Sequence, residues 1–325
     1  MTYRSSLRFL SLLTLLLVPA AAMAGDDGLS LVPVDAAAVG VAHIDQVRSG
    51  ALAAKLFAQT DRMTIDGEGA RLLAQIGLDP TRDIDTVTFA LAPKKGAMQG
   101  GNPLVILEGR FDQAKMIALI EEHGAVKRNS GNRAYYVAPE KVEADHEGAV
   151  AFLSGNRIVA GSEEAVIEAL ANAEKGGSAF RVAGALSADL PHIDAGASAW
   201  ALVDVPRAAR LSGNDPWSGT QDHPGQMLMT SMKKVSAFGL WTTESGEKLY
   251  FGATALSSDP ETRQLLEDAT RGVLAAWRLA AQESEPELVN VIRQFNVKQT
   301  SLGVTISGTV TSDMFQNFAK KSSKM

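Results

Sequence analysis

Cysteine is absent from the 325 residues of the chain. Its absence excludes disulfide bonds, thiolate catalysis and metal sites built on cysteine. The folded chain must therefore be held together by its core, and a chain of this length can bury a sizeable one. The composition, with 46% hydrophobic and 21% charged residues, is that of a folded protein.

Clusters of basic residues are also lacking. The chain has 31 Lys and Arg against 37 Asp and Glu, which gives a formal net charge of −6. Nucleic-acid phosphates need local groups of Lys and Arg to bind them, and anionic lipid surfaces attract basic runs in the same way. We therefore expect no nucleic-acid partner and no electrostatic docking on a membrane.

Long apolar runs are missing beyond the first two dozen residues. At the N-terminus, two arginines, an apolar run and a small-residue cleavage pattern follow one another: Arg4, Arg8, 9–18, Ala22, Ala24 and Gly25. This order is typical of a Sec-type signal peptide, and the run is too short to span a bilayer. It predicts a signal peptide over 1–24, cleaved before Gly25, and a periplasmic or secreted protein of a Gram-negative bacterium without a transmembrane segment in the mature chain.

Recognisable catalytic and cofactor motifs are missing as well. The five histidines are scattered singly, and no phosphate loop, dinucleotide fingerprint or nucleophile elbow occurs. Ser231 opens an S-x-x-K pattern without its companion motifs, and His43 lies in an apolar strand where a core role is favoured. Asp83 and Asp85 resemble the start of a calcium loop, but the required glycine and glutamate do not follow. We expect a solvated strand entry there, and no catalytic, cofactor-binding or metal-binding residues.

The strongest positive pattern is a hairpin followed by a helix. Apolar runs at 86–92 and 103–109 flank a Lys/Gly/Asn loop and lead into an amphipathic segment that ends near His123. Asp112 is placed to cap this helix, and Gly124 to end it.

A weaker copy of this pattern appears in the second half. Residues 234–241 and 249–256 form a second pair of apolar runs, and Asp259 opens a long helix. A strand that ends in Asp45 matches one that ends in Asp204, and each aspartate is placed to cap the helix that follows. Repeated events in one order predict an internal duplication, although two unrelated segments remain an alternative.

The predicted fold class is α+β, with two similar modules of mainly antiparallel sheet and helices packed on one face. The expected boundaries are a signal peptide at 1–24, a first module at 25–177, a linker at 178–196 and a second module at 197–325. The linker is expected to hold a short helix between Phe180 and Leu190.

The second half is rich in Met and Trp. These residues can form ordinary core, which is the favoured interpretation, or line a cavity for an apolar ligand. They are Met227, Met229, Met232, Trp200, Trp241 and Trp277.

The segment 79–85, the strands after it, the run Gly109-Arg-Phe-Asp112 and the repeat resemble a group of uncharacterised exported bacterial proteins. That group is a domain of unknown function with a duplicated α+β module. The resemblance covers most of the mature chain. It implies an exported α+β protein, and it implies no catalytic residues.

Three functions remain open. The first is a non-enzymatic binding or assembly module of the cell envelope, whose partner is another envelope protein. The second is a carrier of a lipid or another apolar ligand, held between the modules. A hydrolase with a site assembled from distant residues ranks third.

Overall fold

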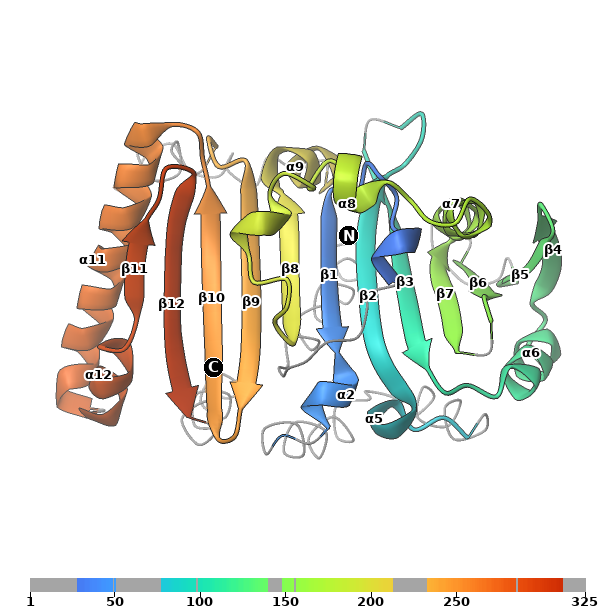
Figure 1. Cartoon of the computed structure of the whole chain (residues 1–325), viewed down its shortest axis with the longest axis horizontal. Helices are drawn as coiled ribbons and strands as arrows, with labels where there is room; N and C mark the ends of the chain where they lie inside the picture. Colours follow the sequence, from blue (N-terminus) through green and yellow to red (C-terminus); the bar gives the residue numbers. More distant parts are fainter. Residues whose placement is uncertain are drawn as a thin grey trace, which may run out of the picture.

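A computed structural model gives the fold of the chain. The strands of the described residues join one sheet in the order β11-β12-β10-β9-β8-β1-β2-β3-β7-β6-β5-β4 (Figure 1). Every pair of neighbours is antiparallel, so the α+β class and the antiparallel sheet are confirmed. The residues that the structure describes are 28–48, 50, 77–97, 99–139, 148–154, 156–212, 233–284 and 286–311.

The first half of the sheet consists of seven strands. They are β1 (Ala38–His43), β2 (Ile84–Pro93), β3 (Gly101–Gly109), β4 (Val126–Ser130), β5 (Arg133–Val137), β6 (Gly148–Phe152) and β7 (Arg157–Ser162). The helices of this half are η2 (Gly28–Leu31), α2 (Ile44–Val47), α5 (Pro80–Asp83), α6 (Gln113–Glu122) and α7 (Glu163–Glu174). The expected hairpin is formed by β2 and β3, which pair from Ile84 to Gly109.

The second half contributes five strands. They are β8 (Ala199–Asp204), β9 (Ala237–Ser245), β10 (Lys248–Leu256), β11 (Asn296–Gln299) and β12 (Gly303–Thr311). Its helices are α8 (Phe180–Ala183), η3 (Leu190–His192), α9 (Val205–Ser212), α11 (Pro260–Ser284) and α12 (Pro286–Ile292). The expected hairpin of this half is formed by β9 and β10, with Gly246 at a φ of 61° in the turn.

The two halves meet in the middle of the sheet. Strand β1 pairs on one side with β2 and on the other with β8, so backbone hydrogen bonds join the halves directly. One apolar core extends across this junction and includes Val39, Trp200 and Leu202. On this face of the sheet the described residues at the junction form packed core, and the carrier hypothesis stays a prediction.

The joining stretch at 178–196 is part of the packed structure. It holds α8 and η3 in the region where a short helix was expected. Phe180 and Leu186 are both fully buried in the shared core. Side chains of the stretch therefore contribute to holding the two halves together.

Side chains cap the main helices where the sequence indicates. Asp112 accepts a hydrogen bond from the Lys115 backbone N–H at 3.1 Å, and Ser162 accepts one from Ala165 at 3.3 Å. Each satisfies a backbone donor in the first turn of its helix. Asp45 is different, because α2 begins at Ile44 with His43 before it. The expectation that Asp45 caps this helix was wrong.

The main helix of each half packs on one face, and the two faces are opposite. Helix α7 buries Val166 and Leu170 against the core that contains Trp200. Helix α11 buries Leu266 and Leu274 against strands β11 and β12. The side chains of β11 and β12 that contact α11 lie on the face of the sheet opposite α7.

The order of elements is similar in the two halves. Each half has a strand, a hairpin and a helix, and each ends with a strand that returns beside the third strand: β7 pairs with β3, and β12 pairs with β10. In the described sheet, three strands lie beyond β7, namely β6, β5 and β4, whereas one strand, β11, lies beyond β12. The internal duplication itself stays a prediction.

Candidate functional site

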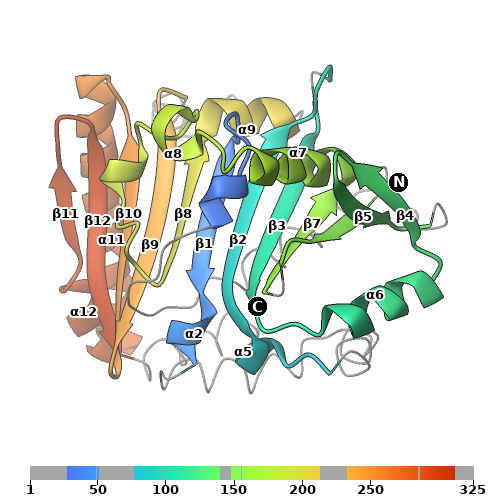
Figure 2. The same cartoon turned by 45° about the vertical axis from the view of Figure 1, so that its right-hand side comes forward.

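The candidate site lies between helix α6 and the sheet. Asp112 caps the start of α6, and Gly124 follows its end with a φ of 87°, a conformation that favours glycine. No residue of α6 is buried. Figure 2 shows the helix standing away from the strands of the first half. Its apolar side is therefore only partly covered by the sheet.

A row of side chains crosses the sheet opposite α6. In successive antiparallel pairs, Val105 lies opposite Ala160, Ala160 opposite Val150, Val150 opposite Tyr136, and Tyr136 opposite Lys127. Residues directly opposite in antiparallel strands point to the same face. Four apolar or aromatic side chains thus form a continuous surface that ends in a lysine at the sheet edge.

Between α6 and this row is an apolar groove with a volume of ≈ 470 Å³, here called the α6 groove. This volume falls within the range of roughly 300–1,000 Å³ that small-molecule sites occupy. Its lining is almost entirely apolar, and consists of Leu119, Ile120, His123, Ala125, Tyr136, Ala138, Pro139, Gly148, Ala149, Val150, Ala160 and Gly161.

Two polar side chains mark the rim of the α6 groove. The Nδ1 atom of His123 lies 2.8 Å from the carbonyl oxygen of Leu119, so this ring is tied to the end of α6. The Nζ atom of Lys127 lies 5.9 Å from the ring centre of Tyr136, a cation–π contact. A bound group would therefore meet apolar surface inside and polar atoms only at the edge.

The same face of the sheet is closed in the second half. The row continues from Val105 through the central strands to Ile306 and Val297, which pack under α11. Leu266 and Leu274 of α11 are 7% and 6% exposed there. Each helix follows the hairpin of its half, yet α11 closes on the sheet and α6 does not.

Several residues singled out in the sequence lie outside the described residues. These are the cleavage-site residues Ala22, Ala24 and Gly25, together with Ser231, Met227, Met229 and Met232. The signal peptide and its cleavage therefore stay predictions, and a catalytic Ser231 stays a weak candidate.

Asp83 and Asp85 lie around the start of β2, where a solvated strand entry was expected. Both carboxylates instead contact neighbouring groups. The carboxylate of Asp85 forms ion pairs with Arg48 at 2.8 Å and with Arg110 at 3.4 Å. Asp83 accepts a hydrogen bond from the backbone N–H of Asp79, and this bond is the main cause that lowers the pKa of Asp83. In the described part of the chain, no group of three or more ligating side chains could hold a metal ion.

The three tryptophans expected in the core divide into two kinds. Trp200 is 2% exposed, and Trp241 packs against the same core. Trp277 is 57% exposed on α11, and Val273 one turn before it is 49% exposed. The expectation of core was therefore right for Trp200 and wrong for Trp277. His43, also assigned to the core, is half-buried, and its Nδ1 lies 3.5 Å from the hydroxyl of Thr86.

Comparison with known proteins identifies no family for the chain. No protein-family model and no curated protein matches the chain. Three crystal forms of the protein TP0453 are similar in structure, at 9–10% sequence identity. For forms I, III and IV the TM-scores are 0.46, 0.45 and 0.44; the matches cover 89%, 87% and 90% of this chain and 94%, 94% and 95% of the other. Among helices in the described ranges, none combines the length and apolar character needed to cross a bilayer.

Proposed function

We propose that the protein is an exported, non-enzymatic binding protein of the bacterial cell envelope, and that it binds an apolar group in the α6 groove. The observation that carries the proposal is the contrast between α6 and α11. Both follow a hairpin and lie on the same face, but α11 buries Leu266 and Leu274 against the sheet, whereas α6 leaves an apolar groove of ≈ 470 Å³ beneath it. The proposal thus favours the carrier hypothesis and moves the ligand from the junction to the first half.

The chemistry of the groove selects the ligand. Leu119 and Ile120 form one wall, while Val150 and Ala160 form the other. Transfer of each methylene from water to such a surface contributes about 0.8 kcal/mol. A hydrocarbon chain or an aromatic ring gains the most binding free energy from this apolar surface, and a strongly hydrated molecule gains none.

A neutral apolar fluorophore such as N-phenylnaphthylamine tests the proposal directly. Binding raises its fluorescence, and titration gives a dissociation constant. The informative variant is Val150→Trp, which places a large ring inside the groove. It should weaken binding by about tenfold or more, since the volume for the probe is lost.

The matched control is Val126→Trp on the neighbouring hairpin. Val126 pairs with Val137, whose side chain belongs to the core on the opposite face, and Val126 is 53% exposed. The same Val-to-Trp change therefore adds an exposed ring outside the groove. Equal fluorophore binding by wild type, Val150→Trp and Val126→Trp would refute the proposed site.

A second candidate function is assembly through the edge of the sheet. Strand β4 ends the strand order and, among the described strands, pairs with β5 alone; four of its five residues are exposed. The opposite edge strand, β11, lies against α11. An open edge of this kind can accept a strand from an envelope protein. Crosslinking from a cysteine placed at Asn129 would detect such a partner, and a clean result would count against it.

A further inference from the structure

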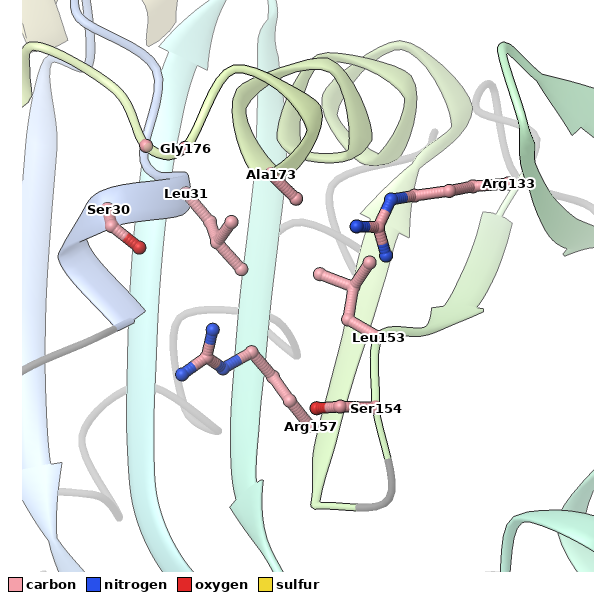
Figure 3. Close-up of a pocket in the computed structure, with 9 residues that line it drawn as sticks. Ser30, Leu31, Arg133, Leu153, Ser154, Arg157, Ala173 and Gly176 are labelled. Carbon is pink, nitrogen blue, oxygen red and sulfur yellow. The ribbon is translucent and has the colours of Figure 1, made fainter.

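A second cavity lies on the opposite face of the sheet, between the end of α7 and strands β5 and β7. Figure 3 shows the guanidinium groups of Arg133 and Arg157 directed into it from two sides, with Leu153 between them. We call it the arginine pocket. Its volume is ≈ 300 Å³, and it is lined by Ser30, Leu31, Arg133, Leu153, Ser154, Arg157, Ala173, Gly176 and Gly177.

Arg157 is held in place by an acidic neighbour. Its Nε donates to Oε1 of Glu108 at 2.8 Å, and its Nη2 lies 2.5 Å from the same oxygen. Both side chains are 17% exposed. Glu108 lies opposite Arg157 in the pair of β3 and β7, so the sheet register itself fixes the contact. The positive charge of Arg157 is compensated within the protein.

Arg133 is not compensated in this way. Its side chain is half-buried, and no hydrogen bond or ion pair joins its guanidinium to any described residue. The nearest acidic group at the end of α7 is Glu174, whose carboxylate accepts a hydrogen bond from the backbone N–H of Asn132 at 3.1 Å. The guanidinium of Arg133 therefore enters the arginine pocket without an ion-pair partner, and a partly buried charge without a partner is costly.

The remaining lining limits the size and shape of a ligand. Ser154 has a φ of 77°, rare for a residue other than glycine, and its hydroxyl donates to Oδ1 of Asn156 at 2.9 Å. That hydroxyl oxygen can still accept a hydrogen bond from a bound polar group. Leu31 and Leu153 supply apolar surface beside the two guanidinium groups.

We propose that the arginine pocket binds a small monocarboxylate with a short apolar chain. The guanidinium fork of Arg133 matches a carboxylate through two parallel hydrogen bonds. The single negative charge of the ligand pairs with the Arg133 guanidinium, and Leu31 and Leu153 contact its apolar chain. This site does not depend on the α6 groove, which lies on the other face.

Isothermal titration calorimetry on the purified protein tests the site with hexanoate as the probe. Hexanoate should bind, while the uncharged hexanamide should bind about tenfold more weakly or not at all, because a charge-assisted pair is lost. Arg133→Gln should weaken hexanoate binding by about tenfold or more. Arg133→Lys, which keeps the charge without the fork, should fall between the two.

Two variants serve as controls. Arg128→Gln removes an arginine from the same hairpin that is paired with Glu163 instead, and Val150→Trp fills the α6 groove. Both should leave hexanoate affinity unchanged within about twofold. Equal affinity for hexanoate and hexanamide in the wild type overturns the proposal, even if Arg133→Gln does not fold. Tighter binding of inorganic phosphate, or hexanoate binding that Val150→Trp abolishes, overturns it too.

Discussion

Trp200 offers a sharp test of the shared core at the junction of the two halves. Its side chain is 2% exposed, and its indole Nε1 has no hydrogen-bond partner in the described structure. Truncation to alanine removes a large buried ring and should lower the free energy of unfolding by about 3–5 kcal/mol. A buried donor without a partner costs about 1–3 kcal/mol in the folded state.

Trp200→Phe separates these two effects. Phenylalanine keeps most of the apolar contact and removes the unpaired N–H. The stability lost from packing and the stability regained by removing the unpaired donor therefore offset each other. We expect this variant to unfold within about 1 kcal/mol of the wild type. Urea denaturation followed by far-ultraviolet circular dichroism measures both variants without relying on tryptophan fluorescence.

The exposed Trp277 supplies the matched control. At 57% exposure on α11 it should tolerate the same change to phenylalanine within about 0.5 kcal/mol. A loss for Trp200→Phe as large as that for Trp200→Ala would refute the reasoning, because it would mean that the indole N–H is satisfied or that packing alone decides. Two separate transitions in the wild type would contradict the shared core.

Three further predictions concern stability. Gly40→Ala places a Cβ 2.1 Å from the ring of Phe89 and should lower the free energy of unfolding in urea by about 1–3 kcal/mol. Val182 is 87% exposed, so Val182→Ser should change the free energy of unfolding by less than about 0.5 kcal/mol. A hydrogen bond from Lys234 lowers the pKa of Asp259 to about 2. The contribution of the ionised carboxylate is therefore present above its ordinary pKa of 3.8 and lost as the pH falls through about 2, so the difference in melting temperature between wild type and Asp259→Asn should shrink over that window.

Local features of the fold could be predicted from the sequence because they depend on neighbouring residues. The runs that form β2 and β3 alternate in the way a hairpin requires, and Asp112 and Ser162 occupy helix-capping positions. Such patterns involve residues a few positions apart. The hairpins, the capped helices and the α+β class followed from them.

Features that depend on distant segments could not be predicted in this way. The pairing of β1 with β8 joins segments about 160 residues apart. The periodicity of α11 places Val273 and Trp277 on one stripe, but it does not say whether another element lies opposite. Both side chains are exposed.

The two candidate sites were missed for the same reason. The sequence of α6 indicates an amphipathic helix, and no local pattern shows how closely its apolar side packs on the sheet. Arg133 and Arg157 lie 24 positions apart, and they converge only because β5, β6 and β7 pair in one register. An arginine at the start of a strand is common in protein sequences, so Arg133 alone does not identify a binding site.

Native mass spectrometry tests whether the α6 groove holds an apolar ligand. The protein is purified from the cell without detergent and measured before and after extraction with organic solvent. We expect an extra mass on the wild type that extraction removes and that Val150→Trp lacks. A bare mass on the wild type, or the same extra mass on Val150→Trp, would contradict it.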